Sequence, residues 1–342
     1  MTSALQIVQA VRSDGFAGVE QYICDVSGEL HGRGHRVVCV GGDPAVMRDR
    51  LPGDVRHVPA RTTREVAVAL ARLRNQSVVH VHMSSAELAA VVTRPVHRAP
   101  VVATRHFAAT RGRSAVLRSA LRAVAAGLSA ELSISQFVAD RSGPGSRVLA
   151  NGVRDRDEVV RRPDRTVLVM QRLEREKDTD VAVEAFAASG LVDDGWVMRI
   201  AGRGALEPDV RRLVHDRGLS AVVELLGFVD DADAVRAGAT VLLAPAAEEP
   251  FGLSVLEAVA SGLPVVAAAG GAHLETLAGS PFLFAPGNVT AAAAALRAVA
   301  SGGPQMSEVT RRLRAEQQRS FSLGGHVDAL ERLYVELSGG TS

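Results

Sequence analysis

The sequence predicts an α/β protein of two Rossmann-like domains, each with a doubly wound parallel sheet, that face a central cleft. Short apolar runs alternate with helical patterns, which is typical of parallel strands joined by crossover helices. A charged stretch at 154–165 interrupts this alternation, which then starts again. The chain has 342 residues, a length that suits two cores better than one.

The first domain is expected to span 1–153. Its first strand is predicted at Leu5 to Val11, and a turn containing Gly15 and Gly18 leads into a helical pattern that Gly32 ends. The other elements are predicted as strands at 36–41, 78–82, 101–104 and 132–135, and as helices at 63–74, 84–93, 114–126 and 136–142.

The second domain is expected at 166–323, after a linker at 154–165. Its strands are predicted at 166–171, 197–201, 223–226, 241–244 and 264–268, with helices between them and from Val289 onward. Residues 324–342 are predicted to form a helix that packs back toward the first domain. Ligands bind open parallel sheets at the carboxyl ends of the strands, so the site is expected there.

Composition favours an ordinary globular enzyme, with 47% hydrophobic and 23% charged residues. The apolar stretches are too short for a bilayer span, and the N-terminus lacks a secretory pattern, so we expect a cytoplasmic protein. Cys24 and Cys39 are expected to be buried apolar side chains. No nucleic-acid partner is expected.

Charge is unevenly distributed along the chain. Residues 1–150 carry 19 Arg and 11 acidic residues, a net charge of +8, whereas residues 151–342 carry a net charge of −7. This asymmetry favours an anionic substrate, a membrane surface, or attraction between the two domains. Among 39 basic residues only Lys177 is a lysine, which predicts a local need for an ammonium group.

The segment 245–264 carries the strongest motif. A strand is predicted to end at Ala244, and a helix to begin near Leu253 after a glycine-containing turn. The free backbone N–H groups at such a helix start can bind a phosphate. Glu249 precedes the helix and Glu257 lies on it. The alternative interpretation, a loop charge and a solvated helix residue, explains the surrounding Pro-Phe-Gly and Ser-Gly-Leu-Pro less well.

This segment resembles the Glu-x7-Glu signature of retaining glycosyltransferase family 4, also called glycosyl transferases group 1, which has the GT-B fold. The resemblance implies that Glu249 contacts the donor sugar and Glu257 the ribose of the nucleotide. Phe251, Gly252 and Leu253 are implied to contact the donor as well.

The segment Gln171 to Lys177 resembles the family's Gly-Arg-Leu-x-x-x-Lys-Gly, with Gln171 and Asp178 in place of the glycines. The resemblance implies that Arg172 and Lys177 hold the donor diphosphate. Fixed cations suit this task because the leaving diphosphate gains negative charge as the glycosidic bond breaks.

Segments in the first half match in the family's order. Ala17 to Glu20 resembles a Gly-Gly-x-Glu loop, in which Gly18 lets the backbone approach the phosphates, and Glu20 is a candidate for acceptor binding. Thr104 to His106 resembles the family's Thr-x-His, whose His lies near the donor sugar, so His106 is a catalytic candidate. His80 and His82 are candidates for the acceptor side. Strand alternation is expected to turn one of them away from the cleft.

Further matches extend the resemblance from Leu5 to Pro286. The segment 151–153 resembles the family's domain junction, and the loops containing Gly202 and Phe228 resemble those around the nucleotide base. Asp155 to Asp157 fits the Asp-x-Asp pattern of metal-dependent transferases, but its place in a charged linker favours a solvated turn. We therefore expect no metal requirement and no cofactor. The glycine pattern does not fit a nicotinamide site.

Residues Arg113 to Leu128 predict an amphipathic helix with an arginine-rich face. A helix packed on the first sheet is favoured over peripheral attachment to anionic lipid.

The resemblance implies transfer of a sugar, with retention of configuration, from a nucleotide diphosphate to an acceptor hydroxyl. We expect a small polar acceptor, such as a natural product or metabolite. The alternatives are synthesis of lipid-linked or cell-envelope glycans, a non-catalytic binding partner that keeps the GT-B fold, and a nucleotide-sugar epimerase.

Overall fold

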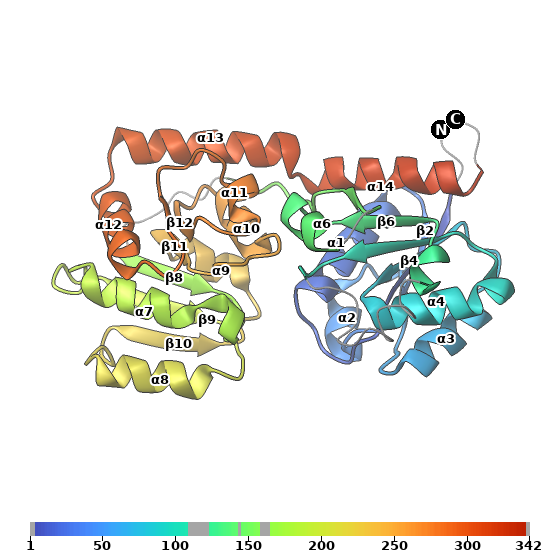
Figure 1. Cartoon of the computed structure of the whole chain (residues 1–342), viewed down its shortest axis with the longest axis horizontal. Helices are drawn as coiled ribbons and strands as arrows, with labels where there is room; N and C mark the ends of the chain where they lie inside the picture. Colours follow the sequence, from blue (N-terminus) through green and yellow to red (C-terminus); the bar gives the residue numbers. More distant parts are fainter. Residues whose placement is uncertain (1–3, 109–122, 143–144, 158–164, 340–342) are drawn as a thin grey trace. The chain divides into compact units, whose positions relative to one another are not determined.

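A computed structural model describes residues 4–108, 123–142, 145–157 and 165–339 (Figure 1). The chain divides into two compact units. The first unit combines Met1–Gly152 with Leu323–Ser342, and the second is the continuous stretch Val153–Ser322. The first unit is therefore assembled from both ends of the sequence.

The first unit contains a seven-stranded sheet in the order β3-β2-β1-β4-β5-β6-β7, with every neighbouring pair parallel. The strands are β1 (Gln6–Val11), β2 (Arg36–Val40), β3 (Arg56–Val58), β4 (Val78–His82), β5 (Val101–Arg105), β6 (Ala130–Ser133) and β7 (Arg147–Val148). The strand order reverses between β1 and β4, which makes their carboxyl ends the expected ligand-binding edge.

Helices cover both faces of this sheet. They are α1 (Gly18–Gly32), α2 (Pro44–Arg50), α3 (Thr63–Arg72), α4 (Ser84–His97), α6 (Gln136–Ser142) and α14 (Leu323–Leu337). One apolar cluster forms between the sheet and helices α1 and α14, and another between the sheet and helices α3 and α4 (Figure 1). Because both faces are covered, the central strands are buried on both sides, as parallel strands usually are.

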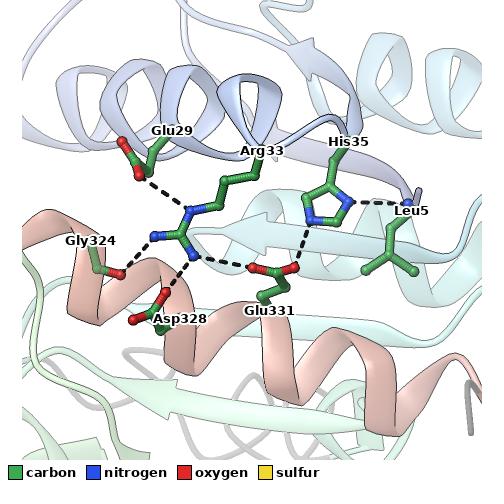
Figure 2. A network of polar contacts seen from close by, with 7 residues as sticks. All are labelled: Leu5, Glu29, Arg33, His35, Gly324, Asp328 and Glu331. Carbon is green, nitrogen blue, oxygen red and sulfur yellow. Dashed lines mark hydrogen bonds and ion pairs between the residues drawn. The ribbon is translucent and has the colours of Figure 1, made fainter. Parts of the chain in front are cut away.

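Helix α14 is held to α1 by a polar network around Arg33 (Figure 2). The Arg33 guanidinium donates to Asp328, to Glu331 at 3.1 Å and to the Gly324 carbonyl oxygen at 3.1 Å. His35 extends this network, since its Nε2 donates to Glu331 at 3.1 Å. Beneath the network, α14 buries Leu323, Val327, Leu330, Leu333 and Tyr334 in the core of the first unit.

The second unit contains a six-stranded parallel sheet in the order β10-β9-β8-β11-β12-β13. Its strands are β8 (Thr166–Met170), β9 (Val197–Ala201), β10 (Val223–Gly227), β11 (Val241–Ala244), β12 (Val265–Ala268) and β13 (Leu283–Phe284). Its helices are the 3-10 turn η1 (Arg175–Lys177), α7 (Thr179–Ala188), α8 (Glu207–Asp216), α9 (Ala232–Ala237), α10 (Leu253–Ala260), α11 (His273–Thr276), α12 (Val289–Ala300) and α13 (Pro304–Ser320). One continuous apolar cluster unites this unit.

The predicted fold class of two doubly wound parallel sheets is confirmed. The sequence did not predict β3, β7 or β13, which have two or three residues each and too little apolar periodicity to be recognised. The helix predicted at 114–126, like the amphipathic face from Arg113 to Leu128, lies largely outside the described residues. Within the described part of the chain, no helix combines the length and apolar character needed to cross a bilayer.

Candidate active site

The loop after β8 carries Lys177, and two side chains fix its shape. The Gln171 amide donates to the Lys177 carbonyl oxygen at 2.8 Å and to Thr179 Oγ1 at 3.0 Å. Asp178 has a positive φ of 47° and accepts a hydrogen bond from the backbone N–H of Ala247 at 3.0 Å. Gln171 and Asp178, which stand where the family motif has glycines, therefore close this loop and attach it to the loop after β11.

The loop after β11 carries Glu249 and ends at Gly252, where α10 begins. Gly252 has a φ of +86°, a conformation that side-chain-bearing residues rarely adopt. Gly271 packs against the Glu249 backbone so closely that a Cβ atom there would lie 2.3 Å from the Glu249 carbonyl oxygen. The Ala272 N–H also donates to this oxygen at 2.8 Å. The backbone of Glu249 is thus fixed from two sides.

Lys177 and Glu249 meet at the end of these two loops. Lys177 Nζ donates to Glu249 Oε2 at 2.6 Å, and the two side chains are only 12% and 15% exposed. Burial alone would raise the pKa of Glu249, but the Lys177 charge and its hydrogen bond lower the pKa below the usual range. The carboxylate is therefore ionised. An ammonium has three donors, so Lys177 retains donors for a phosphate.

Arg172 lies differently from Lys177. Its side chain is 47% exposed and donates to Glu176 at 2.7 Å. The predicted joint hold of Arg172 and Lys177 on a diphosphate stays a prediction.

Glu257 belongs to a second ion-pair cluster, on α10. Arg236, whose side chain is only 2% exposed, donates to Glu257 Oε2 at 2.8 Å and also binds Asp233. Arg156 binds Asp233 as well, and its guanidinium lies 4.0 Å from Glu257 Oε1. Arg236 was not predicted from the sequence. The expected solvated turn is wrong for Arg156, whose side chain is only 22% exposed, whereas Asp155 and Asp157 are exposed.

The remaining predicted donor residues of the second unit follow β9, β10 and β11. Gly202 packs against the loop after β8, since a Cβ atom there would lie 1.8 Å from the Gln171 carbonyl oxygen. Phe228 is 47% exposed, whereas Phe251 is buried against Phe321 with ring centroids 6.0 Å apart. Leu253 is the first residue of α10 and is partly buried.

Gly18 and Glu20 lie at the start of α1 in the first unit. Gly18 is the first helical residue and is exposed. Glu20 is only 6% exposed, and its carboxylate accepts the backbone N–H of Ala17 at 2.9 Å. Glu20 therefore caps the helix, a role that the resemblance did not indicate, and its acceptor contact stays a prediction.

His106 ends a chain of buried polar groups at the carboxyl edge of the first sheet. His82 Nε2 donates to Gln9 Oε1 at 2.8 Å, so in the neutral ring Nδ1 accepts from His106 Nε2, 2.9 Å away. His80 bonds to Thr104 Oγ1 at 2.7 Å and to the Tyr334 hydroxyl. Burial lowers the pKa of His106 to about 3, so the ring is neutral near pH 7.

The expectation that His80 and His82 point to opposite sides is wrong. They are two residues apart on β4 and therefore share a face, with ring centroids 4.5 Å apart. Both are fully buried. The predicted acceptor contact of His82 is untested.

His273, the first residue of α11, was not predicted either. It is fully buried and its Nδ1 lies 3.1 Å from the Ala268 carbonyl oxygen, but its Nε2 has no hydrogen-bond partner among the described residues. The pair Gly270-Gly271 after β12 is the signal that could have drawn attention to this loop.

Two family models match the chain. The model named Glycosyltransferase Family 4 matches residues 16–155, and the model named Glycosyl transferases group 1 matches residues 154–316. Together they include every predicted site residue, in the order that the motifs require. The chain belongs to glycosyltransferase family 4.

Relatives of this family 4 chain include a mannosyltransferase of Mycobacterium tuberculosis described as GDP-mannose-dependent and acting on phosphatidylinositol dimannoside. It is 34% identical over 150 residues, which are 42% of this chain and 38% of the relative. The chain spans less than two fifths of the length of the first curated relatives that it matches.

Solved structures confirm the GT-B fold. Anabaena Alr3699/HepE in complex with UDP-glucose has a TM-score of 0.82 at 17% identity, and the match covers 97% of this chain and all of that one. AviGT4, a glycosyltransferase involved in avilamycin A biosynthesis, has a TM-score of 0.73 at 20% identity, with 98% and 99% covered.

Proposed function

We propose that this protein transfers a sugar from a nucleotide diphosphate to a hydroxyl group of an acceptor, with retention of anomeric configuration and without a metal ion. The observation that carries this proposal is the Lys177–Glu249 ion pair at the start of α10. It places a cation, a carboxylate and free helix N–H groups together, and these are the groups that a sugar diphosphate requires.

Each group has a distinct task in this reaction. Lys177 and the amides that follow Gly252 stabilise the diphosphate as it gains charge, with Arg172 as a second cation. Glu249, held ionised, accepts hydrogen bonds from sugar hydroxyls. The departing phosphate oxygen takes the proton of the acceptor hydroxyl on the same face of the sugar, so configuration is retained.

His106 of the first unit stays a catalytic residue in our proposal. His106 donates its Nε2 hydrogen to His82. Nδ1 of the neutral ring can therefore accept a hydrogen bond from the sugar or from the acceptor substrate. Glu257 binds the ribose hydroxyls. The buried Arg236 orients the Glu257 carboxylate for this contact.

The first acceptor class that we propose is a small polar molecule. The second candidate is a lipid-linked or cell-envelope glycan, favoured by the similarity to the mycobacterial mannosyltransferase. Transfer assays with the two acceptor classes distinguish them, because only a lipid-dependent enzyme needs vesicles carrying the acceptor.

A thermal-shift screen with UDP, GDP, ADP and dTDP tests the donor class. A ligand at 100 times its dissociation constant stabilises the folded protein by about 2.7 kcal/mol, so the matching nucleotide raises the melting temperature. If none of the four raises it, the proposed function is wrong.

Two variants locate the donor within the site. We expect Glu257→Ala to weaken nucleotide diphosphate binding, whereas Glu249→Ala lowers kcat and leaves this binding nearly unchanged. Calorimetry and steady-state kinetics measure both effects. The opposite pattern would exchange the roles of the two carboxylates.

A further inference from the structure

His273 holds a buried nitrogen that has no partner in the described part of the chain. Its side chain is fully buried, and its Nε2 makes no hydrogen bond with any residue that the structure describes. Buried polar atoms in native proteins nearly always have partners, because an unsatisfied group forfeits its hydration without compensation. A histidine at this position therefore needs a reason that the packing of the second unit does not supply.

The ring's other nitrogen fixes what Nε2 can do. Nδ1 lies 3.1 Å from the Ala268 carbonyl oxygen, which only accepts hydrogen bonds, so Nδ1 carries the hydrogen. Burial lowers the pKa of His273 and outweighs the opposing influence of the Glu249 carboxylate. The ring is therefore neutral near pH 7, and Nε2 is a hydrogen-bond acceptor.

Nε2 faces the groups that we assign to the donor sugar. An atom added at the Cβ position of Gly252 would lie 3.4 Å from His273 Nε2 and 3.4 Å from Glu249 Cγ. The His273 ring and the Glu249 side chain therefore flank the same glycine at the start of α10. The backbone bond from Ala272 to Glu249 at 2.8 Å fixes this arrangement.

We propose that His273 Nε2 accepts a hydrogen bond from a hydroxyl of the transferred sugar, beside the hydroxyls that Glu249 binds, and thereby helps to select that sugar. Because Nε2 is buried and lies near Gly252 and the Glu249 side chain, the hydroxyl reaches it when donor binding changes the Glu249 side-chain conformation. The phosphates lie instead at Lys177 and the amides of α10, so His273 acts on the sugar and leaves the nucleotide diphosphate unaffected. This inference rests on the proposed function.

Two variants separate the sugar contact from a structural role. His273→Asn keeps a donor toward the Ala268 carbonyl oxygen but places no atom at the Nε2 position, whereas His273→Gln brings an amide oxygen near that position. The probes are the nucleoside diphosphate that raises the melting temperature in the screen, together with its glucose and mannose esters. Calorimetry measures their affinities for the wild-type protein and both variants.

We expect His273→Asn to bind the diphosphate like the wild type and to bind the preferred sugar ester about tenfold more weakly. His273→Gln should recover part of this loss. Monodeoxy forms of the ester sharpen the test: one of them should bind the wild type about tenfold more weakly than the parent ester, while His273→Asn should not discriminate between the two.

Several results would overturn the inference. Equal losses for the diphosphate and its ester would assign His273 to loop packing alone, and unchanged ester binding would remove it from the site. If His273→Asn does not fold, the wild type and His273→Gln still test the inference. Wild-type protein that binds every monodeoxy ester as tightly as the parent ester would exclude the contact. Failure of all four diphosphates to bind the wild type would instead contradict the proposed function itself.

Discussion

Lys177 is the residue on which the proposed chemistry depends most. A compact ammonium can bind Glu249 and a phosphate oxygen together, whereas the planar guanidinium of arginine directs its donors in a fixed fork. The ion pair at 2.6 Å shows that this position accommodates a small cation at short range. The single use of lysine in a chain with 38 arginines has a physical explanation here.

We expect Lys177→Ala to lower kcat/KM by about a hundredfold or more, the effect of removing one fixed stabiliser of developing charge. Lys177→Arg should restore part of the activity. Steady-state kinetics provide the measurement. Arg175→Ala, on the same turn, is the matched control and should stay near the wild type. Near-normal efficiency of Lys177→Ala would exclude Lys177 from the diphosphate site.

The residues at this site differ in how far sequence could predict them. Lys177 and Glu249 stand in linear motifs, so each could be recognised alone, although nothing linear shows that they touch. Arg236 has no such signal, because its contact with Glu257 exists only after folding. The Gly270-Gly271 pair marks the loop of His273, but the approach of the His273 ring to Gly252 also exists only after folding. Strand alternation, applied correctly, would have placed His80 and His82 on one face.

Among the helices and strands, α14 is the one whose contribution to the stability of the fold can be measured most directly by a single substitution. Arg33 connects α1 to three groups on α14, and this side chain is only 25% exposed. A network of this kind is worth more than an isolated surface ion pair, which contributes about 0 to 1 kcal/mol.

We expect Arg33→Ala to lower the free energy of unfolding by about 1 to 2 kcal/mol, since it leaves Glu331 and Asp328 without their common cation. Urea unfolding measures the change. Arg319→Ala is the control, because the Arg319 side chain is 65% exposed and pairs only within α13 in the described contacts. Equal effects of the two substitutions would show that the Arg33 network does not hold α14.

The buried histidines of the first unit predict acid sensitivity. Burial lowers the pKa of His106 to about 3 and that of His326 to about 4, whereas both titrate near 6.5 in the unfolded chain. Below pH 6.5 the unfolded state therefore binds protons that the folded state does not, and stability falls from there toward pH 3 to 4. At pH 5.5, protonation of these two residues in the unfolded state lowers the free energy of unfolding by about 3 kcal/mol.

Unfolding in urea at pH 7.5 and pH 5.5 measures this loss. His326→Gln should reduce the difference between the two pH values, whereas His215→Gln should not, because the His215 side chain is 83% exposed. A stability that does not change between these pH values would contradict the assignment of neutral buried rings.

The longer helices and strands were easier to predict from the sequence than the short ones. The valine-rich segments of β1, β4 and β8 indicated buried parallel strands, because alternation with helices leaves both of their faces covered. By contrast, α2 has only seven residues, and its start depends on the Asp43 side chain accepting two backbone N–H bonds. Such local capping is visible in the sequence only when the helix that follows has a recognisable apolar face.

At the scale of the whole molecule, we predict that transfer does not require a metal ion. In the proposed mechanism, Lys177 and the amide groups at the start of α10 supply the positive charge that a metal would supply elsewhere. Among residues 4–108, 123–142, 145–157 and 165–339, no three His, Cys, Asp or Glu side chains gather in an arrangement suited to a metal. Asp155 of the Asp-x-Asp pattern is hydrogen-bonded to Gln317 at 3.2 Å.

Transfer rates should therefore be equal in excess EDTA and in added magnesium or manganese. Loss of activity in EDTA that either metal restores would contradict this prediction and would require a different account of how the diphosphate leaves.

The division of the first unit between both ends of the chain has a consequence for how the protein is made. A ribosome releases residues 1–152 first, yet the helix that covers one face of their sheet begins at Leu323. The second unit is continuous, so it emerges next and can fold before Leu323 is made. Synthesis of this unit takes roughly 10 to 30 s at ordinary rates of translation. During that interval the apolar face beside α1 lacks its cover. The unit that is translated first is therefore completed last, and its nascent form is the one whose apolar surface is open to aggregation.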